Sequence, residues 1–212
     1  MTPLEDFDLA ASAVTGLVSA VGAWDAPTAC ADWDVRAVVN HLAHGNAKVA
    51  FWAGAGPPAP EGDYLGASPV EAFAASVLRA RTVLVSPGLL TRTVTTPLGE
   101  VPGVFLVHMR VNEYVVHGWD IADATGASTD LLPDLAVSAL EQWRSRFGAT
   151  PRQPGGPFGP EVPALAEATA ADRLAAFLGR RSARGLRGLA CWCALLAAWT
   201  PVRAAGLCTC AG

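Results

Sequence analysis

Lysine is almost absent from this chain of 212 residues. Arginine accounts for fourteen of its fifteen basic residues, and Lys48 is the exception. The formal net charge is −4, so the chain as a whole lacks the excess of clustered Lys and Arg that binds phosphate backbones. Nucleic acid is therefore not an expected partner.

Long apolar runs are missing as well. No run reaches the roughly 20 residues that a membrane span needs, so no membrane association is expected. The N-terminal stretch "MTPLEDFDLAASAV" carries acids where a secretory signal would carry positive charge, which predicts a cytoplasmic protein. Hydrophobic residues make up 51% of the chain, enough for one core, and the length favours a single domain.

Apolar residues recur at helical spacing along most of the chain, while strand patterns are scarce. The spacing predicts helices over about 3–21, 35–54, 69–86, 104–124, 134–147 and 171–180. Asp32 or Asp34 is expected to cap the second helix, and Ser68 with Glu71 has the form of a capping box for the third. Residues 91–103 contain β-branched residues and two prolines, which predicts a short extended or strand connection. The expected architecture is an all-α helical bundle.

Residues 181–212 do not continue this pattern. They contain four Arg, no acid, and four of the five cysteines, with Cys30 as the exception. The cysteines are paired as C-x-C, whereas zinc sites usually use C-x-x-C. We therefore divide the chain into a helical bundle over 1–180 and an atypical tail over 181–212, which we expect to be poorly structured or loosely packed.

The stretch "NEYVVHGWD" places Glu113 and His117 in an otherwise apolar helix. Residues four apart project from one face, so these two side chains can reach one point. Burying an unpaired carboxylate is costly, and a divalent cation bound by a carboxylate and two imidazoles would remove that cost. The second imidazole must come from another helix, and the second helix offers His41 and His44. A hydrogen-bonded or exposed Glu–His pair is the alternative interpretation.

A set of two His and one carboxylate leaves coordination positions free. This is the pattern of catalytic zinc, and it also suits ferrous iron, nickel or manganese. His108 lies nine residues before His117, nearly half a turn away, and is not expected to share the site. Cys30 is more simply structural or incidental than a nucleophile.

The stretches from Trp24 to Leu42 and from Glu113 to Gly126 together resemble the metal-binding domain of the mycothiol-dependent maleylpyruvate isomerase family. These proteins belong to the DinB-like helical-bundle metalloproteins of actinobacteria and their relatives. The resemblance covers about residues 4–180 and implies a DinB-like four-helix bundle. It assigns the metal ligands to His41, Glu113 and His117. His44 remains an alternative ligand or a residue that contacts a ligand from outside the site. Asp120 could orient a ligand histidine, or it could be a helix-surface Asp or an ion-pair partner of Arg110 or Arg36. Trp33 and Trp119 are buried aromatics or pocket-lining residues.

The resemblance also implies a reaction. In this family the metal binds the thiol of mycothiol, and the thiolate adds to an activated cis double bond, permits rotation, and leaves. This chain matches a short form without the C-terminal domain of the full-length isomerase. We therefore expect a metal- and thiol-dependent isomerisation or thiol transfer on a small electrophile, with zinc as the first candidate metal and mycothiol as a possible cofactor. The alternatives are metal-assisted hydrolysis and a non-catalytic metal-binding or structural module that could form a homodimer.

Overall fold

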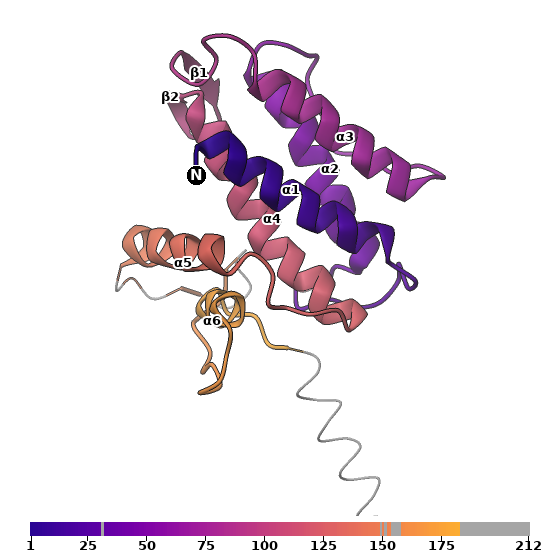
Figure 1. Ribbon diagram of the computed structural model, residues 1–212, viewed down its shortest axis with the longest axis vertical. Coiled ribbons are helices and arrows are strands. Elements are labelled where there is room, and N and C mark those ends of the chain that lie inside the picture. Colours follow the sequence, from indigo (N-terminus) through magenta and orange to yellow (C-terminus); the bar gives the residue numbers. More distant parts are fainter. Residues whose placement is uncertain (31, 149, 151, 154–157, 183–212) are drawn as a thin grey trace, which may run out of the picture.

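A computed structural model describes residues 1–30, 32–148, 150, 152–153 and 158–182 of the chain. The described residues form six helices and a two-stranded hairpin (Figure 1). In chain order these elements are α1 (Pro3–Ser19), α2 (Val35–Trp52), α3 (Pro69–Leu84), β1 (Thr93–Thr96), β2 (Gly99–Pro102), α4 (Val104–Thr125), α5 (Pro133–Phe147) and α6 (Ala170–Phe177). The predicted all-α class with a short strand connection is confirmed.

The first four helices form the bundle. Helix α4 packs against α1 and α2, and α3 packs against the same two helices from the other side. Their buried stripes meet in one core that includes Phe7, Leu42, Phe73, Leu106 and Tyr114, each of which is fully buried. The antiparallel hairpin pairs Val94 with Val101 and connects α3 to α4 at one end of the bundle (Figure 1). The DinB-like bundle expected from the sequence is therefore present.

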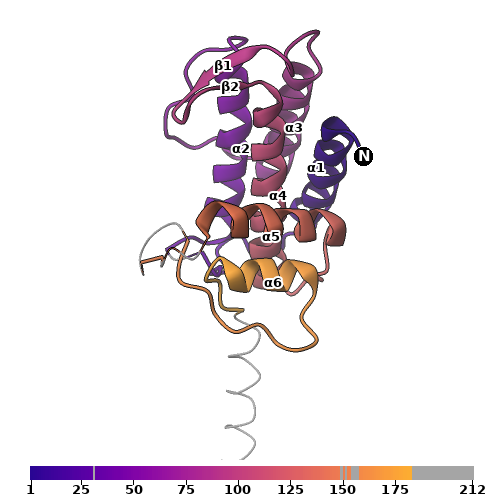
Figure 2. The ribbon, with the colours of Figure 1, turned by 90° about the vertical axis from the view of Figure 1, so that its left-hand side faces the viewer.

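Helices α5 and α6 are not additional members of the bundle. They pack against each other and against α4, and Figure 2 shows them lying crosswise to the four bundle helices. Their buried residues include Leu135, Leu140, Leu174 and Phe177, so this pair forms a second layer that covers part of α4. The residues just after α6 contact α4, where Arg180 pairs with Asp120.

Helix ends show where local sequence signals decide structure. Asp34 accepts a hydrogen bond from the Ala37 N–H and caps α2, and Gly126, with φ 80°, ends α4 in the left-handed conformation. The capping box expected at Ser68 is wrong, because this residue begins α3 without a side-chain cap hydrogen bond at φ −125° and ψ 72°. Helices α1, α2 and α3 each end two residues earlier than predicted.

Residues 183–212 lie outside the described residues, so the predicted division at residue 180 and the predicted nature of the tail stay predictions. Among the described residues, no helix is both long enough and apolar enough to cross a membrane.

Candidate metal centre

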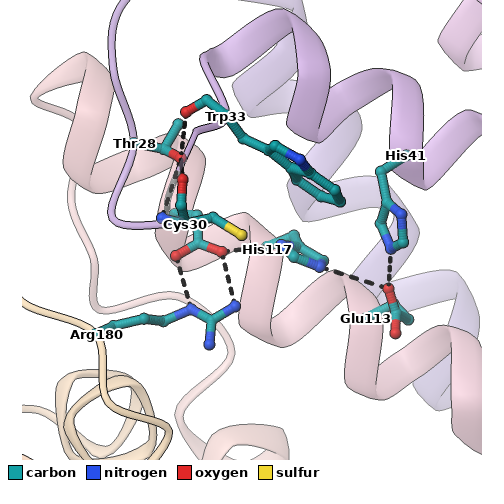
Figure 3. A network of polar contacts seen from close by, with 8 residues as sticks. Thr28, Cys30, Trp33, His41, Glu113, His117 and Arg180 are labelled. Atoms are coloured by element: carbon teal, nitrogen blue, oxygen red, sulfur yellow. Dashed lines mark hydrogen bonds and ion pairs between the residues drawn. The ribbon is translucent and has the colours of Figure 1, made fainter. Parts of the chain in front are cut away.

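Three predicted ligands converge between α2 and α4. His41 comes from α2, and Glu113 and His117 come from successive turns of α4 (Figure 3). His41 Nε2 lies 2.7 Å from Glu113 Oε2, and His117 Nε2 lies 3.5 Å from the same oxygen. One potential ligand atom from each residue falls within 4.8 Å of the others. Two ring nitrogens and a carboxylate oxygen therefore face one point.

The cluster is open on one side. The side chains of His41 and Glu113 are 35% and 31% exposed, whereas that of His117 is 10% exposed. The two cavities of about 500 and 550 Å³ described elsewhere on the molecule are not lined by any of the three residues. A small molecule can thus approach the cluster directly from solvent, with His117 at the rear.

Glu113 carries a negative charge at neutral pH. Partial burial by itself would raise its pKa, but the hydrogen bond from His41 and the charges of His117 and Arg110 lower it to about 2. The carboxylate is therefore available as an anionic ligand over the physiological range.

Asp120 is completely buried and holds the far side of the His117 ring. Its Oδ2 accepts a hydrogen bond from His117 Nδ1 at 2.9 Å, which leaves Nε2 directed at the cluster. Burial would raise the pKa of Asp120, but the guanidinium of Arg180 and the hydrogen bond from His117 lower it. A carboxylate in this position fixes the tautomer and orientation of a ligand histidine.

The sequence leaves Arg110 or Arg36 open as an ion-pair partner of Asp120, and that expectation is wrong, because both arginines have other partners. Arg36 pairs with Asp63 at 3.2 Å on the surface, and Arg110 donates to Asn46 and to the Leu42 carbonyl oxygen. The partner is Arg180, sixty residues away in the sequence. Helical spacing identifies neighbours only within one helix, so it could not single out Arg180 among the several arginines that follow Gly179.

Trp33 lines the candidate centre. Its ring centroid lies 4.9 Å from that of His41 and 6.0 Å from that of His117, so the indole covers both imidazoles on one side (Figure 3). Trp119 has a different environment. It is 4% exposed, donates from Nε1 to Asp172 at 2.8 Å, and lines the cavity of about 550 Å³ beside α6.

The ring nitrogens of His44 have partners outside the cluster. Nε2 lies 2.7 Å from the Ala59 carbonyl oxygen and Nδ1 lies 3.4 Å from Glu61, while the ring stacks on Tyr64 at 4.8 Å. His44 therefore holds the loop that follows α2 against that helix. The structure therefore does not bring His44 into the group formed by His41, Glu113 and His117.

Two further residues considered from the sequence are also separate from the cluster. His108 is exposed on α4, as its position in the helix predicts. Cys30 is a half-buried free thiol whose pKa is raised by burial and by the charge of Asp120. A thiol with a raised pKa is not activated as a nucleophile, which agrees with a structural or incidental role.

A buried arginine, Arg110, links α2 to α4 close to the cluster. Arg110 is 1% exposed, and its guanidinium lies 4.9 Å from the Tyr114 ring centre. Gly45 makes room for it, because a Cβ atom at this position would lie 2.1 Å from Arg110 Nη1. Asn46 accepts from both Arg110 and Tyr114 and donates to Ser76. This satisfied network holds the two helices that carry the candidate ligands.

Comparison with known proteins places this geometry in a family. Residues 7–122, more than half of the chain, match the family described as the mycothiol maleylpyruvate isomerase N-terminal domain. Uncharacterized proteins from two strains of Mycobacterium tuberculosis are each 40% identical over 185 residues, covering 85% of this chain and 98% of their own length.

The crystal structure of the mycothiol-dependent maleylpyruvate isomerase has a similar fold. It superposes with a TM-score of 0.51 over 68% of this chain and 70% of its own, at 20% sequence identity. This likeness concerns the fold, whereas the family match concerns the sequence of the segment that contains all three clustered residues. The chain therefore belongs to the mycothiol maleylpyruvate isomerase N-terminal domain family.

Proposed function

We propose that this protein binds a divalent metal ion, with zinc as the first candidate, through His41, Glu113 and His117. The observation that carries the proposal is the convergence of three ligand atoms, from two different helices, within 4.8 Å of one another. Two neutral imidazoles and one carboxylate are the ligands of open zinc and ferrous sites. The depressed pKa of Glu113 supports the anionic member of the set.

Two of the separations within the cluster can be compared with those around a bound zinc ion. Two atoms that share a tetrahedral zinc at about 2.0–2.1 Å are separated by roughly 3.3 Å. The separation of His117 Nε2 from Glu113 Oε2 is 3.5 Å, and that of His41 Nε2 from the same oxygen is 2.7 Å. The His41–Glu113 hydrogen bond would have to open for a zinc ion to enter, and both side chains are at the exposed side of the cluster.

The reaction that we propose is a thiol-dependent isomerisation or thiol transfer on a small electrophile. When bound at this site, a divalent cation would supply the acidity that turns a coordinated thiol into a thiolate at neutral pH. The chain contributes the remaining requirements. Asp120 holds the proton at Nδ1 of His117, Trp33 covers one side of the two rings, and the exposed edges of His41 and Glu113 leave a path for the thiol. Membership in the isomerase family favours mycothiol as that thiol.

The open side of the cluster supports a reactive centre over a closed structural one. Within the described part of the chain, the group of potential ligand residues has three members, so coordination positions would remain for a thiol. A structural zinc site would instead be completed by a fourth protein ligand.

Cobalt substitution tests the proposal. The Co²⁺-loaded protein is titrated with mycothiol and, separately, with a simple alkyl thiol, and its absorption spectrum is recorded. We expect a thiolate-to-cobalt charge-transfer band in the wild type and in His108→Ala, which removes an exposed histidine from the same helix, and no band in His117→Ala. Bound cobalt without such a band in the wild type would overturn the thiol chemistry and leave a non-catalytic metal site.

A further inference from the structure

The carboxylate behind His117 is shared between two partners. Asp120 Oδ2 accepts from His117 Nδ1 at 2.9 Å and from an Nη of Arg180 at 3.2 Å, while its Oδ1 accepts from Arg180 Nε at 2.8 Å. Figure 3 shows Arg180 entering from the α6 side. Arg180 is itself only 6% exposed. The two bonds from the planar guanidinium fix the plane of the carboxylate, and the carboxylate fixes the imidazole.

The end of α6 places Arg180 through its backbone. Arg180 N–H donates to the Ala175 carbonyl, and Gly179 N–H donates to the Ala176 carbonyl, both at 3.0 Å. These are the two hydrogen bonds of a Schellman motif, with Gly179 in the left-handed conformation at φ 85°. The turn ends α6 before residue 180 and sends the next side chain toward α4.

Packing around this turn leaves little freedom. A Cβ atom on Gly179 would lie 2.7 Å from the Gly159 Cα, so the turn is pressed against the preceding loop. The Arg180 guanidinium also lies 6.0 Å from the Phe158 ring centre, on the side of an aromatic cluster with Trp143 and Phe147. Arg180 is therefore held by the α5–α6 layer while it contacts the bundle.

We propose that Arg180 is a positioning residue for the candidate metal centre, acting through Asp120 to hold the His117 ring with Nε2 toward Glu113 and His41. The inference rests on the proposed metal site and goes beyond it. It makes ligand geometry in the bundle depend on the docking of α6, although Arg180 lies outside the residues 7–122 that match the family. Outer partners of ligand histidines typically change metal affinity 10–100-fold when removed.

The test compares two neighbouring arginines. Arg180→Met removes the buried guanidinium, and Arg181→Met removes an exposed one from the next position. Zinc dissociation constants are measured by competition with a chromophoric chelator, and the stability of each metal-free protein is measured by urea unfolding. We expect Arg180→Met to bind zinc 10–100-fold more weakly and Arg181→Met to bind it as the wild type does.

A double-mutant cycle separates positioning from general stability. If Arg180 acts through Asp120, the double variant Asp120→Asn/Arg180→Met loses no more zinc affinity than Asp120→Asn alone. Lowered stability of Arg180→Met with an unchanged zinc dissociation constant would overturn the inference, because a purely structural ion pair would give that result. Should Arg180→Met not fold, Arg180→Gln replaces it, since its amide can donate one hydrogen bond. A several-fold loss is then expected, and an unchanged constant overturns the inference.

These outcomes are distinguishable from a failure of the proposed function. A wild type that binds no zinc refutes the metal site itself. A wild type that binds zinc, together with equal constants in Arg180→Met and Arg181→Met, refutes only the role of Arg180.

Discussion

The interface between α2 and α4 carries two polar groups with opposite properties. The Arg110 group is sealed: Arg110, Asn46 and Tyr114 are each no more than 1% exposed, and they donate hydrogen bonds to one another and to the neighbouring Leu42 carbonyl oxygen and Ser76 hydroxyl. The group of His41, Glu113 and His117 is open to solvent, and its ring nitrogens face a single carboxylate oxygen. The polar atoms of the first group bond to one another and to adjacent residues, whereas one polar atom from each residue of the second group faces a common point.

Whether the polar atoms of a group bond to one another or face a common point indicates the role of that group better than its burial does. A buried polar network is stable when every donor has an acceptor. Three converging ligand atoms at an accessible face can instead be completed by an ion from outside the chain, which is what we propose for this cluster. The two groups share their helices, so variants in each can be compared on one scaffold, with stability and metal binding as separate measurements.

The largest expected effect on stability comes from the sealed group. Arg110→Met removes the side-chain donor to the Leu42 carbonyl oxygen and one of the two donors to Asn46 Oδ1, so we expect the free energy of unfolding to fall by about 3 kcal/mol. Urea unfolding followed by circular dichroism measures this change. The control is Arg79→Met, at an exposed position on α3, for which a change within about 0.5 kcal/mol is expected. Equal losses in the two variants would show that the buried network contributes no special stability.

Metal binding at the open group should raise the unfolding free energy of the protein by an amount comparable to the loss expected for Arg110→Met. At a free zinc concentration 100 times the dissociation constant, linkage predicts about 2.7 kcal/mol of added stability in the wild type. We expect His41→Ala to lose this gain and His44→Ala to keep it, because His44 binds the loop after α2 instead. Unfolding with and without zinc provides the measurement. If zinc still stabilises His41→Ala by the same amount, α2 contributes no ligand to the site.

Acid should weaken the metal-free protein through Glu113. The pKa of this carboxyl is lowered from 4.5 to about 2, so its contribution to stability is complete above pH 4.5 and is lost as the pH falls toward 2. In the presence of a chelator, the stability difference between the wild type and Glu113→Gln should shrink as the pH falls from 4.5 toward 2. A difference that does not change with pH would mean that Glu113 titrates normally.

The smallest expected effect concerns the loop after α2. His44→Ala removes the ring that lies 2.7 Å from the Ala59 carbonyl oxygen and stacks on Tyr64. We expect a loss of about 1 kcal/mol in unfolding free energy and faster proteolytic cleavage within residues 54–67. Wild-type cleavage rates in the variant would show that the stacking and hydrogen bond do not restrain the loop.

Local sequence patterns predicted most of the fold and the members of the cluster. Spacing of four residues within one helix placed Glu113 and His117 together, and the family resemblance selected His41 over His44. The bundle follows from the apolar stripes of four helices. Turn chemistry was less reliable, since Ser68 begins α3 without the expected cap while Asp34 and Gly126 behave as predicted.

Contacts between segments far apart in the sequence could not be predicted. Neither the crosswise packing of α5 and α6 nor the pairing of Asp120 with Arg180 has a periodic signal. Both depend on the direction that the chain takes after Gly126 and Gly179, where a left-handed residue ends a helix. Pairwise spacing fixes what lies on a helix face, but it does not determine which distant residue will cover that face.

Metal content of the purified protein tests the central claim most directly. Plasma mass spectrometry of the wild type, His117→Ala and His108→Ala, each prepared in zinc-supplemented medium and gel-filtered, gives the metal bound per chain. We predict about one zinc ion per chain in the wild type and in His108→Ala, and a negligible amount in His117→Ala. Equal metal in all three proteins, whether one ion or none, would contradict the account.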